Sequence, residues 1–217
     1  MADKISTNDL INQLSLDLTE VTPPKPIWWT VGQWLILCLF VAIVANTLMG
    51  YDPQVWQALM SPLFLLKQLV LLAASAISVY GAISISLPGQ EKSWPRAWAV
   101  GLSVFWLVFL LFFLGRDIAE RGTDSLFFHW GMFCVKWILI TALPLGVFLI
   151  LRVRAGYPLH RGWAGFLTLT AAGTFSGFAL QFHCFGDPFH SLLWHLVPVY
   201  LIGGSGILVG QFLLRSK

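Results

Sequence analysis

Residues 27–48 read IWWTVGQWLILCLFVAIVANTL, a stretch without a single charged side chain. An α-helix needs about 20 consecutive apolar residues to cross the hydrocarbon core of a bilayer, so this stretch is long enough to do so. Five more apolar runs of similar length follow it, at residues 62–87, 97–114, 132–151, 163–182 and 192–214. Because unpaired backbone groups are costly in lipid, each run is expected to be a helix. The sequence therefore predicts an all-α, polytopic membrane protein with six transmembrane helices.

The composition supports the same class. Hydrophobic residues make up 57% of the chain and charged residues only 11%, whereas soluble domains carry about a quarter charged residues. The connections between the apolar runs are short and contain glycine and proline, with no room for an inserted soluble domain. We expect two parts, a polar tail over residues 1–26 and a six-helix membrane domain over residues 27–217. The lipid bilayer is expected as a partner. In a membrane protein the net charge of +3 says little about nucleic acid, and no direct nucleic-acid partner is expected.

Basic residues are unevenly divided between the two ends of the predicted helices. One set of connections and both termini hold Lys4, Lys25, Lys92, Arg96, Arg152, Arg154, Arg161, Arg215 and Lys217. The opposite face holds Lys67, Arg116, Arg121 and Lys136. Since cytoplasmic loops carry the excess of lysine and arginine, both termini are expected in the cytoplasm.

The polar tail contains a short amphipathic segment. Its apolar side chains, spaced to share one helical face, are Leu10, Ile11, Leu14 and Leu18. The prolines at 23, 24 and 26 end the helix and form a stiff spacer to the membrane. A helix on the membrane surface and a frayed segment both remain open, but the acidic residues Asp9, Asp17 and Glu20 disfavour an anionic leaflet. Docking into the groove of a cytoplasmic protein fits the pattern better.

Thiols and imidazoles gather on the predicted outer face. Cys134 begins the fourth apolar run and Cys184 follows the fifth, which brings two thiols to the same surface. Side chains that could approach one another there are Cys134, Cys184, His129, His183, His190 and His195. Cysteine and histidine bind zinc or cuprous copper, and two thiols on an oxidising face could equally form a disulfide. We take Cys134, Cys184 and His183 as candidate metal ligands.

Plainer interpretations exist for several of these residues. A histidine at a helix end often serves as an interfacial hydrogen-bonding group, and Asp187 before Pro188 is suited to a turn. Lys67 and Lys136 lie inside apolar runs but close enough to the outer face to extend their amines to water. Cys38 is expected to pack as a small hydrophobic side chain. Glycines at 203, 204 and 206, and the pair Gly173 and Gly177, indicate close helix packing.

Several short motifs follow one another along the chain. The tail reads Asn8-Asp9-Leu10-Ile11-x-x-Leu14-x-x-Asp17-Leu18 and ends at Pro23-Pro24, and Leu87-Pro88-Gly89 follows the second apolar run. Cys134 and Leu143-Pro144 lie in the fourth run, before His183-Cys184-x-x-Asp187 and, seven residues further, Trp194. In this order and spacing the chain resembles the NrsF family of bacterial inner-membrane anti-sigma factors, over essentially its whole length.

The resemblance implies a regulatory function. Members of that family hold an extracytoplasmic-function sigma factor at the inner membrane through the N-terminal segment and release it when outer-face cysteines meet heavy metals or oxidants. Carried over, Cys134 and Cys184 would be the sensing pair, and the sigma-binding residues would be Leu10, Ile11, Leu14, Asp17 and Leu18. We take His183, Asp187, His190 and Trp194 as candidate neighbours of the sensing pair. His190 and His195 are not matched to positions of the family, so the roles of these two histidines stay open. No resident cofactor is expected, only transient binding of a heavy metal.

Two other classes of protein are weighed against this one. A membrane thiol oxidoreductase would be expected to carry C-x-x-C, which is absent, and haem ligation uses histidines deep inside helices. A small metal-handling transporter has support only from Lys67 and Lys136, without a visible inverted repeat. We therefore expect a regulator rather than an enzyme.

Overall fold

The computed structural model describes residues 6–16, 26–50, 53–87, 89–90, 92–122, 131–184 and 188–214. These residues form helices and their connections, and no strand occurs among them. Six helices are long and apolar enough to cross a membrane. The predicted fold class is confirmed.

The elements follow one another as an up-and-down series. Their bounds are α1 (Thr7–Leu16), α2 (Ile27–Met49), α3 (Val55–Leu59), α4 (Pro62–Ser86), α5 (Trp94–Arg121), α6 (Met132–Ala155), α7 (Arg161–Leu180), α8 (Pro188–His190), the π-helix η2 (Ser191–Leu196) and α9 (Val197–Leu213). Large apolar side chains cover the outer faces, among them Ile36, Phe112 and Leu143, as expected where helices contact lipid.

Several helix boundaries differ from the sequence prediction. The third membrane helix runs from Trp94 to Arg121 rather than over residues 97–114. Its last turns are held by ion pairs four residues apart, Arg116 with Glu120 at 2.7 Å and Arg121 with Asp117 at 2.8 Å. Apolar runs mark only the part of a helix inside lipid, so this polar extension gave no signal. The sixth membrane segment begins at Pro188 rather than at residue 192 and includes a π-helical turn.

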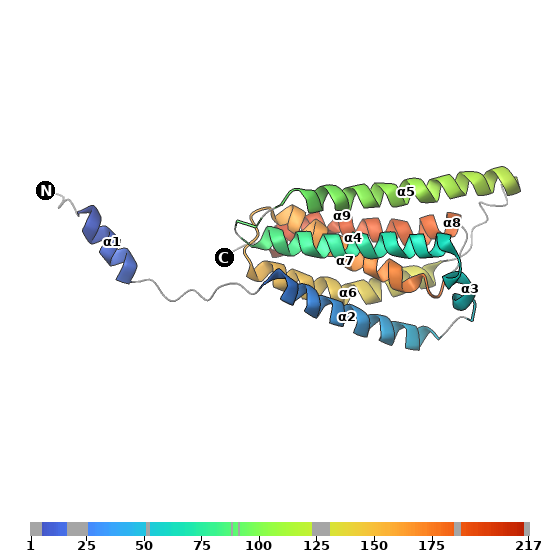
Figure 1. Ribbon diagram of the computed structural model, residues 1–217, viewed down its shortest axis with the longest axis horizontal. Coiled ribbons are helices and arrows are strands. Elements are labelled where there is room, and N and C mark those ends of the chain that lie inside the picture. Colours follow the sequence, from blue (N-terminus) through green and yellow to red (C-terminus); the bar gives the residue numbers. More distant parts are fainter. Residues whose placement is uncertain are drawn as a thin grey trace.

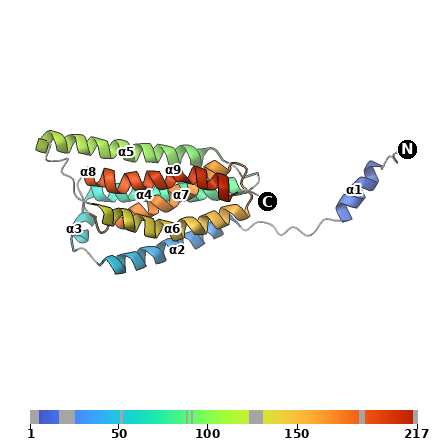
Figure 2. The ribbon, with the colours of Figure 1, turned by 180° about the vertical axis from the view of Figure 1, so that it is seen from behind.

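Helix α7 occupies the centre of the bundle. It packs against α4, α6 and α9, while α5 and α2 lie on opposite sides of this core (Figures 1 and 2). The first residues of α2 and the last residues of α9 lie at one end of the bundle, and α3 and α8 lie at the other. Helix α1 lies apart from the bundle, on the side of the end where α2 begins (Figure 1).

Small residues let α7 and α9 approach until their backbones touch. A Cβ added at Gly165 would overlap the carbonyl oxygen of Gly206 and Cα of Gly210, and one at Gly206 would overlap the carbonyl of Gly165. Close backbone approach of this kind is the usual role of glycine in membrane helix pairs. The sequence prediction named Gly206 but did not single out Gly165 or Gly210. In contrast, Gly204 has open space around it.

A valine at residue 206 is therefore expected to destabilise the bundle. Gly206→Val forces two backbones apart, which places its effect at the upper end of the about 1–3 kcal/mol that overpacking costs. Thermal unfolding of the purified protein in detergent would measure the loss. Gly204→Val is the matched control because it adds the same side chain to the same helix facing open space. Equal unfolding temperatures for the two variants would contradict the packing described here.

Candidate functional site

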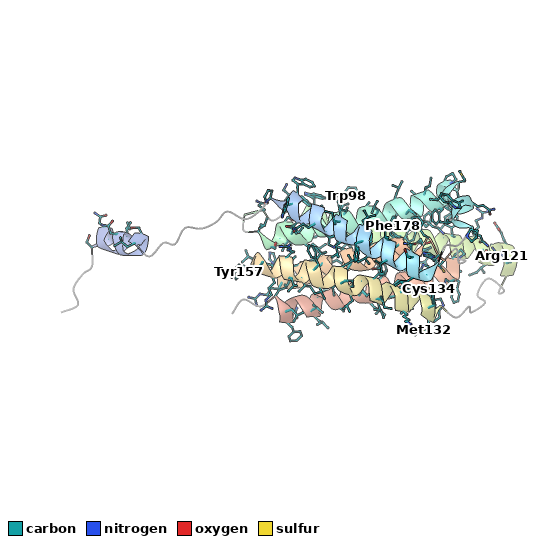
Figure 3. All side chains as sticks on the ribbon, turned by 90° about the horizontal axis from the view of Figure 1, so that it is seen from below. Trp98, Arg121, Met132, Cys134, Tyr157 and Phe178 are labelled. Carbon is teal, nitrogen blue, oxygen red and sulfur yellow. The ribbon has the colours of Figure 1, made fainter. Side chains whose placement is uncertain are left out.

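Two cysteines and two histidines converge at the end of the bundle that carries α3 and α8. Cys134 lies in the first turn of α6, Cys184 follows α7, His190 ends α8 and His195 lies in η2. One sulfur or ring nitrogen from each side chain lies within 4.8 Å of those of the other three. We call these four residues the Cys–His cluster. Figure 3 shows Cys134 near Met132 at this end, with Tyr157 at the opposite end.

The distances within the Cys–His cluster are short. The Cys134 thiol donates a hydrogen bond to Sγ of Cys184, with the two sulfurs 3.6 Å apart. Nε2 of His190 lies 3.6 Å from the sulfur of Cys134 and 3.2 Å from that of Cys184. All three cysteines of the chain are free thiols in this structure.

The π-helix explains how two histidines five residues apart share one face. In a regular α-helix with 3.6 residues per turn, positions five apart are rotated by about 140° from each other. A π-helix closes its turn with i→i+5 hydrogen bonds, which brings such positions almost into line. The ring centroids of His190 and His195 accordingly lie 5.4 Å apart, with the planes at 76°. Single π-helical turns are frequently found at functional sites.

Trp194 packs against the residue that precedes α6. A Cβ at Gly131 would overlap the indole ring of Trp194, so only glycine fits between this ring and the start of the helix. The amide of Cys134 donates to the carbonyl of Gly131 at 2.9 Å, which fixes the first turn that carries the thiol. Trp194 therefore contributes to the position of Cys134 without joining the Cys–His cluster.

His195 is buried and has one ring nitrogen without a partner. Its side chain is 3% exposed, and the amide nitrogen of Gln181 lies 3.4 Å from Nδ1. The other ring nitrogen, Nε2, is buried and makes no hydrogen bond. An unpaired buried polar atom costs about 1–3 kcal/mol, so this arrangement is unfavourable unless something binds there.

The surroundings of Cys184 favour its thiolate. The hydrogen bond from Cys134 holds the pKa of the Cys184 thiol well below its usual range. The charges of His195 and His190 lower it further, against the opposing effect of burial. A thiolate is the form that attacks oxidants and binds metals, and Cys184 is half-buried rather than enclosed.

Not all of the predicted neighbours of the cysteines lie beside them in the structure. His183 does not join the Cys–His cluster, because its Nε2–H donates to Oδ1 of Asn46 in α2. Asp187 and His129 lie outside the described residues. The spacing of His190 and His195 would have indicated a shared face only if a π-helical turn had been expected there.

The remaining candidates lie elsewhere. Cys38 is 1% exposed and packs in the core with Trp34 and Val41. Lys136 is exposed, and Lys67 is half-buried near the start of α4. In the tail, α1 includes Leu10, Ile11 and Leu14, of which Ile11 is exposed, while Asp17 and Leu18 lie outside the described residues.

Comparisons with known proteins bear on the whole chain. The model of the NrsF family, described as negative regulator of sigma F, matches residues 14–215. A protein of Azospira oryzae named "Probable anti-sigma-F factor NrsF" is 25% identical over 224 residues, covering 97% of this chain and 100% of that protein. An "Anti-sigma-F factor NrsF" of Caulobacter vibrioides is 26% identical over 220 residues, covering 96% and 99%. No solved structure matches the chain.

Proposed function

This chain belongs to the NrsF family of negative regulators of sigma F, and from that premise we propose how it regulates. It holds an extracytoplasmic-function sigma factor at the bacterial inner membrane through residues 1–26. It releases that factor when Cys134 and Cys184 bind a heavy metal or are oxidised. The protein acts by binding, as the regulatory character of the family indicates, and not as an enzyme.

The observation that carries the proposal is the approach of the two thiols. Their sulfurs lie 3.6 Å apart although they come from residues 50 positions apart in the sequence. A two-electron oxidant would join them in a disulfide, with two electrons passing to the oxidant and two protons leaving the thiols. A soft metal ion would bind both thiolates instead. The disulfide draws the start of α6 and the end of α7 together, because its sulfurs lie only about 2.0 Å apart. A bound metal ion instead fixes these two segments to each other.

The proposed orientation places sensing and sigma binding on opposite sides of the membrane. The basic residues Arg96, Arg152 and Arg154 lie on the turns at the end of the bundle from which the tail extends. The Cys–His cluster lies at the other end. With the basic end in the cytoplasm, the thiols face the periplasm, where disulfides persist.

A contact beside Cys184 offers a route from the sensor to the tail. Nδ2 of Asn46 donates to the carbonyl of Ala42, which leaves Oδ1 to accept the hydrogen bond from His183. Asn46 lies in the last turn of α2, and α2 runs without interruption back to Ile27, next to the tail. A shift of residues 183–184 therefore pulls on a rigid helix whose far end carries the sigma-binding segment.

Replacing Asn46 with leucine is expected to weaken induction while sigma binding stays intact. Asn46→Leu keeps the size of the side chain and removes the acceptor for His183. Couplings between sites are usually worth 5–150-fold, so a fall in induction within that range is expected in a sigma-dependent reporter strain. Thr47→Val is the control, because Thr47 is exposed and bonds only within its own helix, to the carbonyl of Ile43. Equal induction in both variants would rule out this route.

The sigma partner can be identified directly. Full-length tagged protein is purified from membranes of its own host in mild detergent, and co-purifying proteins are identified by mass spectrometry. A sigma factor in stoichiometric amount is expected, and its loss after cadmium or peroxide treatment would show regulated release. Absence of any sigma factor from untreated membranes would overturn the proposal.

A further inference from the structure

The Cys–His cluster has more donors than a two-thiol sensor needs. We propose that Cys134, Cys184, His190 and His195 together form a tetrahedral binding site for one soft or borderline closed-shell metal ion, of the class of Zn²⁺, Cd²⁺ and Cu⁺. The two histidines are then metal ligands rather than neighbours of a thiol pair. Only the consequence for sigma release rests on the proposed function, whereas metal binding itself does not.

The distances are already close to those of a bound site. With Zn–S near 2.3 Å and Zn–N near 2.0–2.1 Å, a tetrahedral centre separates two sulfurs by about 3.8 Å and a sulfur from a nitrogen by about 3.6 Å. The corresponding distances here are 3.6 Å between the sulfurs, and 3.6 and 3.2 Å from the sulfurs to Nε2 of His190. Little rearrangement of these three groups is needed to admit an ion.

The types of donor select the class of metal. Thiolate and imidazole suit zinc, cadmium and cuprous copper, whereas magnesium and calcium prefer oxygen ligands. The four residues of the Cys–His cluster include no carboxylate. Two cysteines and two histidines form one of the common ligand sets of zinc in proteins.

The unpaired ring nitrogen of His195 is an independent sign of a missing ligand. Nε2 is buried without a hydrogen-bond partner, in a side chain whose ligand atom lies within 4.8 Å of the other three. A metal ion would satisfy this atom. With Nε2 on the metal, Nδ1 carries the ring proton. The Gln181 amide, turned to present its oxygen, would accept that proton and orient the ring, as partners of the second ring nitrogen do in known metal sites.

The local backbone is arranged to present both histidines. The π-helical turn Ser191–Leu196 brings His195 onto the face that carries His190, towards Cys134 and Cys184. An ion bound there would fix the first turn of α6 to the start of the last membrane segment as well as to Cys184. The site thus joins three segments of the bundle, where a disulfide would join two.

The test uses the reduced full-length protein in detergent, kept under a phosphine reductant that binds metals weakly. Co²⁺ serves as a spectroscopic probe, because its absorption distinguishes tetrahedral from octahedral sites and shows thiolate ligation. We expect one Co²⁺ per chain with a tetrahedral, thiolate-ligated spectrum that is displaced by Zn²⁺. His190→Ala and His195→Ala should each lower zinc affinity by more than the roughly 10–100-fold that loss of an outer partner costs. His160→Ala, at the start of α7 at the other end of the bundle, should leave the affinity unchanged.

X-ray absorption at the zinc edge of the wild-type protein supplies a measurement that does not depend on folded variants. Two sulfur ligands near 2.3 Å and two nitrogen ligands near 2.0–2.1 Å are expected. Sulfur-only or oxygen-rich ligation, or full zinc affinity in both histidine variants, would overturn the four-ligand site. Failure of this inference leaves the proposed function standing if the cysteines still control sigma release. Metal binding at the four residues without any sigma release would instead support the metal site and contradict the proposed function.

Discussion

A chain that carries Leu10→Asp and Leu14→Asp is expected to leave its sigma factor active without any inducer. Both leucines belong to the apolar face predicted for α1, and they are spaced four residues apart, one turn of the helix. Docking such a face into a groove removes it from water, and two aspartates would have to be desolvated there instead.

The size of the effect follows from burial. Full burial of one leucine side chain is worth about 1.5–3 kcal/mol, so loss of two removes about 3 kcal/mol or more. That corresponds to a fall in affinity of about 100-fold or more, since each 1.4 kcal/mol is a factor of ten. Titration of the purified sigma factor against the full-length protein in detergent would measure it, and a reporter strain would show constitutive expression.

Leu16→Asp is the matched control for this experiment. At 100° per residue, Leu16 lies on nearly the opposite side of the helix from the predicted face, and its side chain is 85% exposed. It therefore makes the same change of residue type and adds the same kind of charge to the same helix. If Leu16→Asp released the factor as fully as the double variant, general charge repulsion would explain the result and the apolar face would not.

The sequence was enough to predict the six membrane helices, because lipid demands long apolar runs and few other structures produce them. It could not give the full length of α5, since residues 115–121 include four charged side chains and so lie outside the apolar run, although ion pairs join these side chains along the helix. It also could not show that Gly165 of α7 faces Gly206 of α9, because such a contact depends on how the two helices are rotated.

The sequence predicted the cysteines of the candidate site but not which histidines join them. Topology alone brings Cys134 and Cys184 to the same end of the bundle, and the structure places them in contact. Which histidines join them depends on the local backbone. His183 is the histidine next to Cys184 in the sequence, yet it turns to Asn46, while the more distant His195 reaches the thiols through a π-helical turn. The periodicity of a regular α-helix would place His190 and His195 on different faces, so it does not predict that both reach the thiols.

Cys134→Ser and Cys184→Ser are each expected to abolish induction by cadmium or peroxide while leaving repression intact. Either variant removes one of the two thiols needed for a disulfide, and it also removes one thiolate from the proposed metal site. Sigma binding should persist because the Cys–His cluster and α1 lie toward opposite ends of the molecule. Reporter expression before and after inducer, with the thiol state followed by alkylation, measures both properties.

Cys38→Ala separates this effect from general damage to a membrane protein. Cys38 is a free thiol that lies buried in the core beside Trp34 and Val41, so its loss removes a small packing contribution and no sensing group. Its strain should respond to cadmium and peroxide like the wild type, with alkylation still reporting oxidation of Cys134 and Cys184. Full induction in either serine variant would remove the thiol pair from the mechanism. Equal loss in all three variants would instead trace the effect to the fold, because Cys134 and Cys184 contact each other and His190 at the end of the bundle, whereas Cys38 packs in the core.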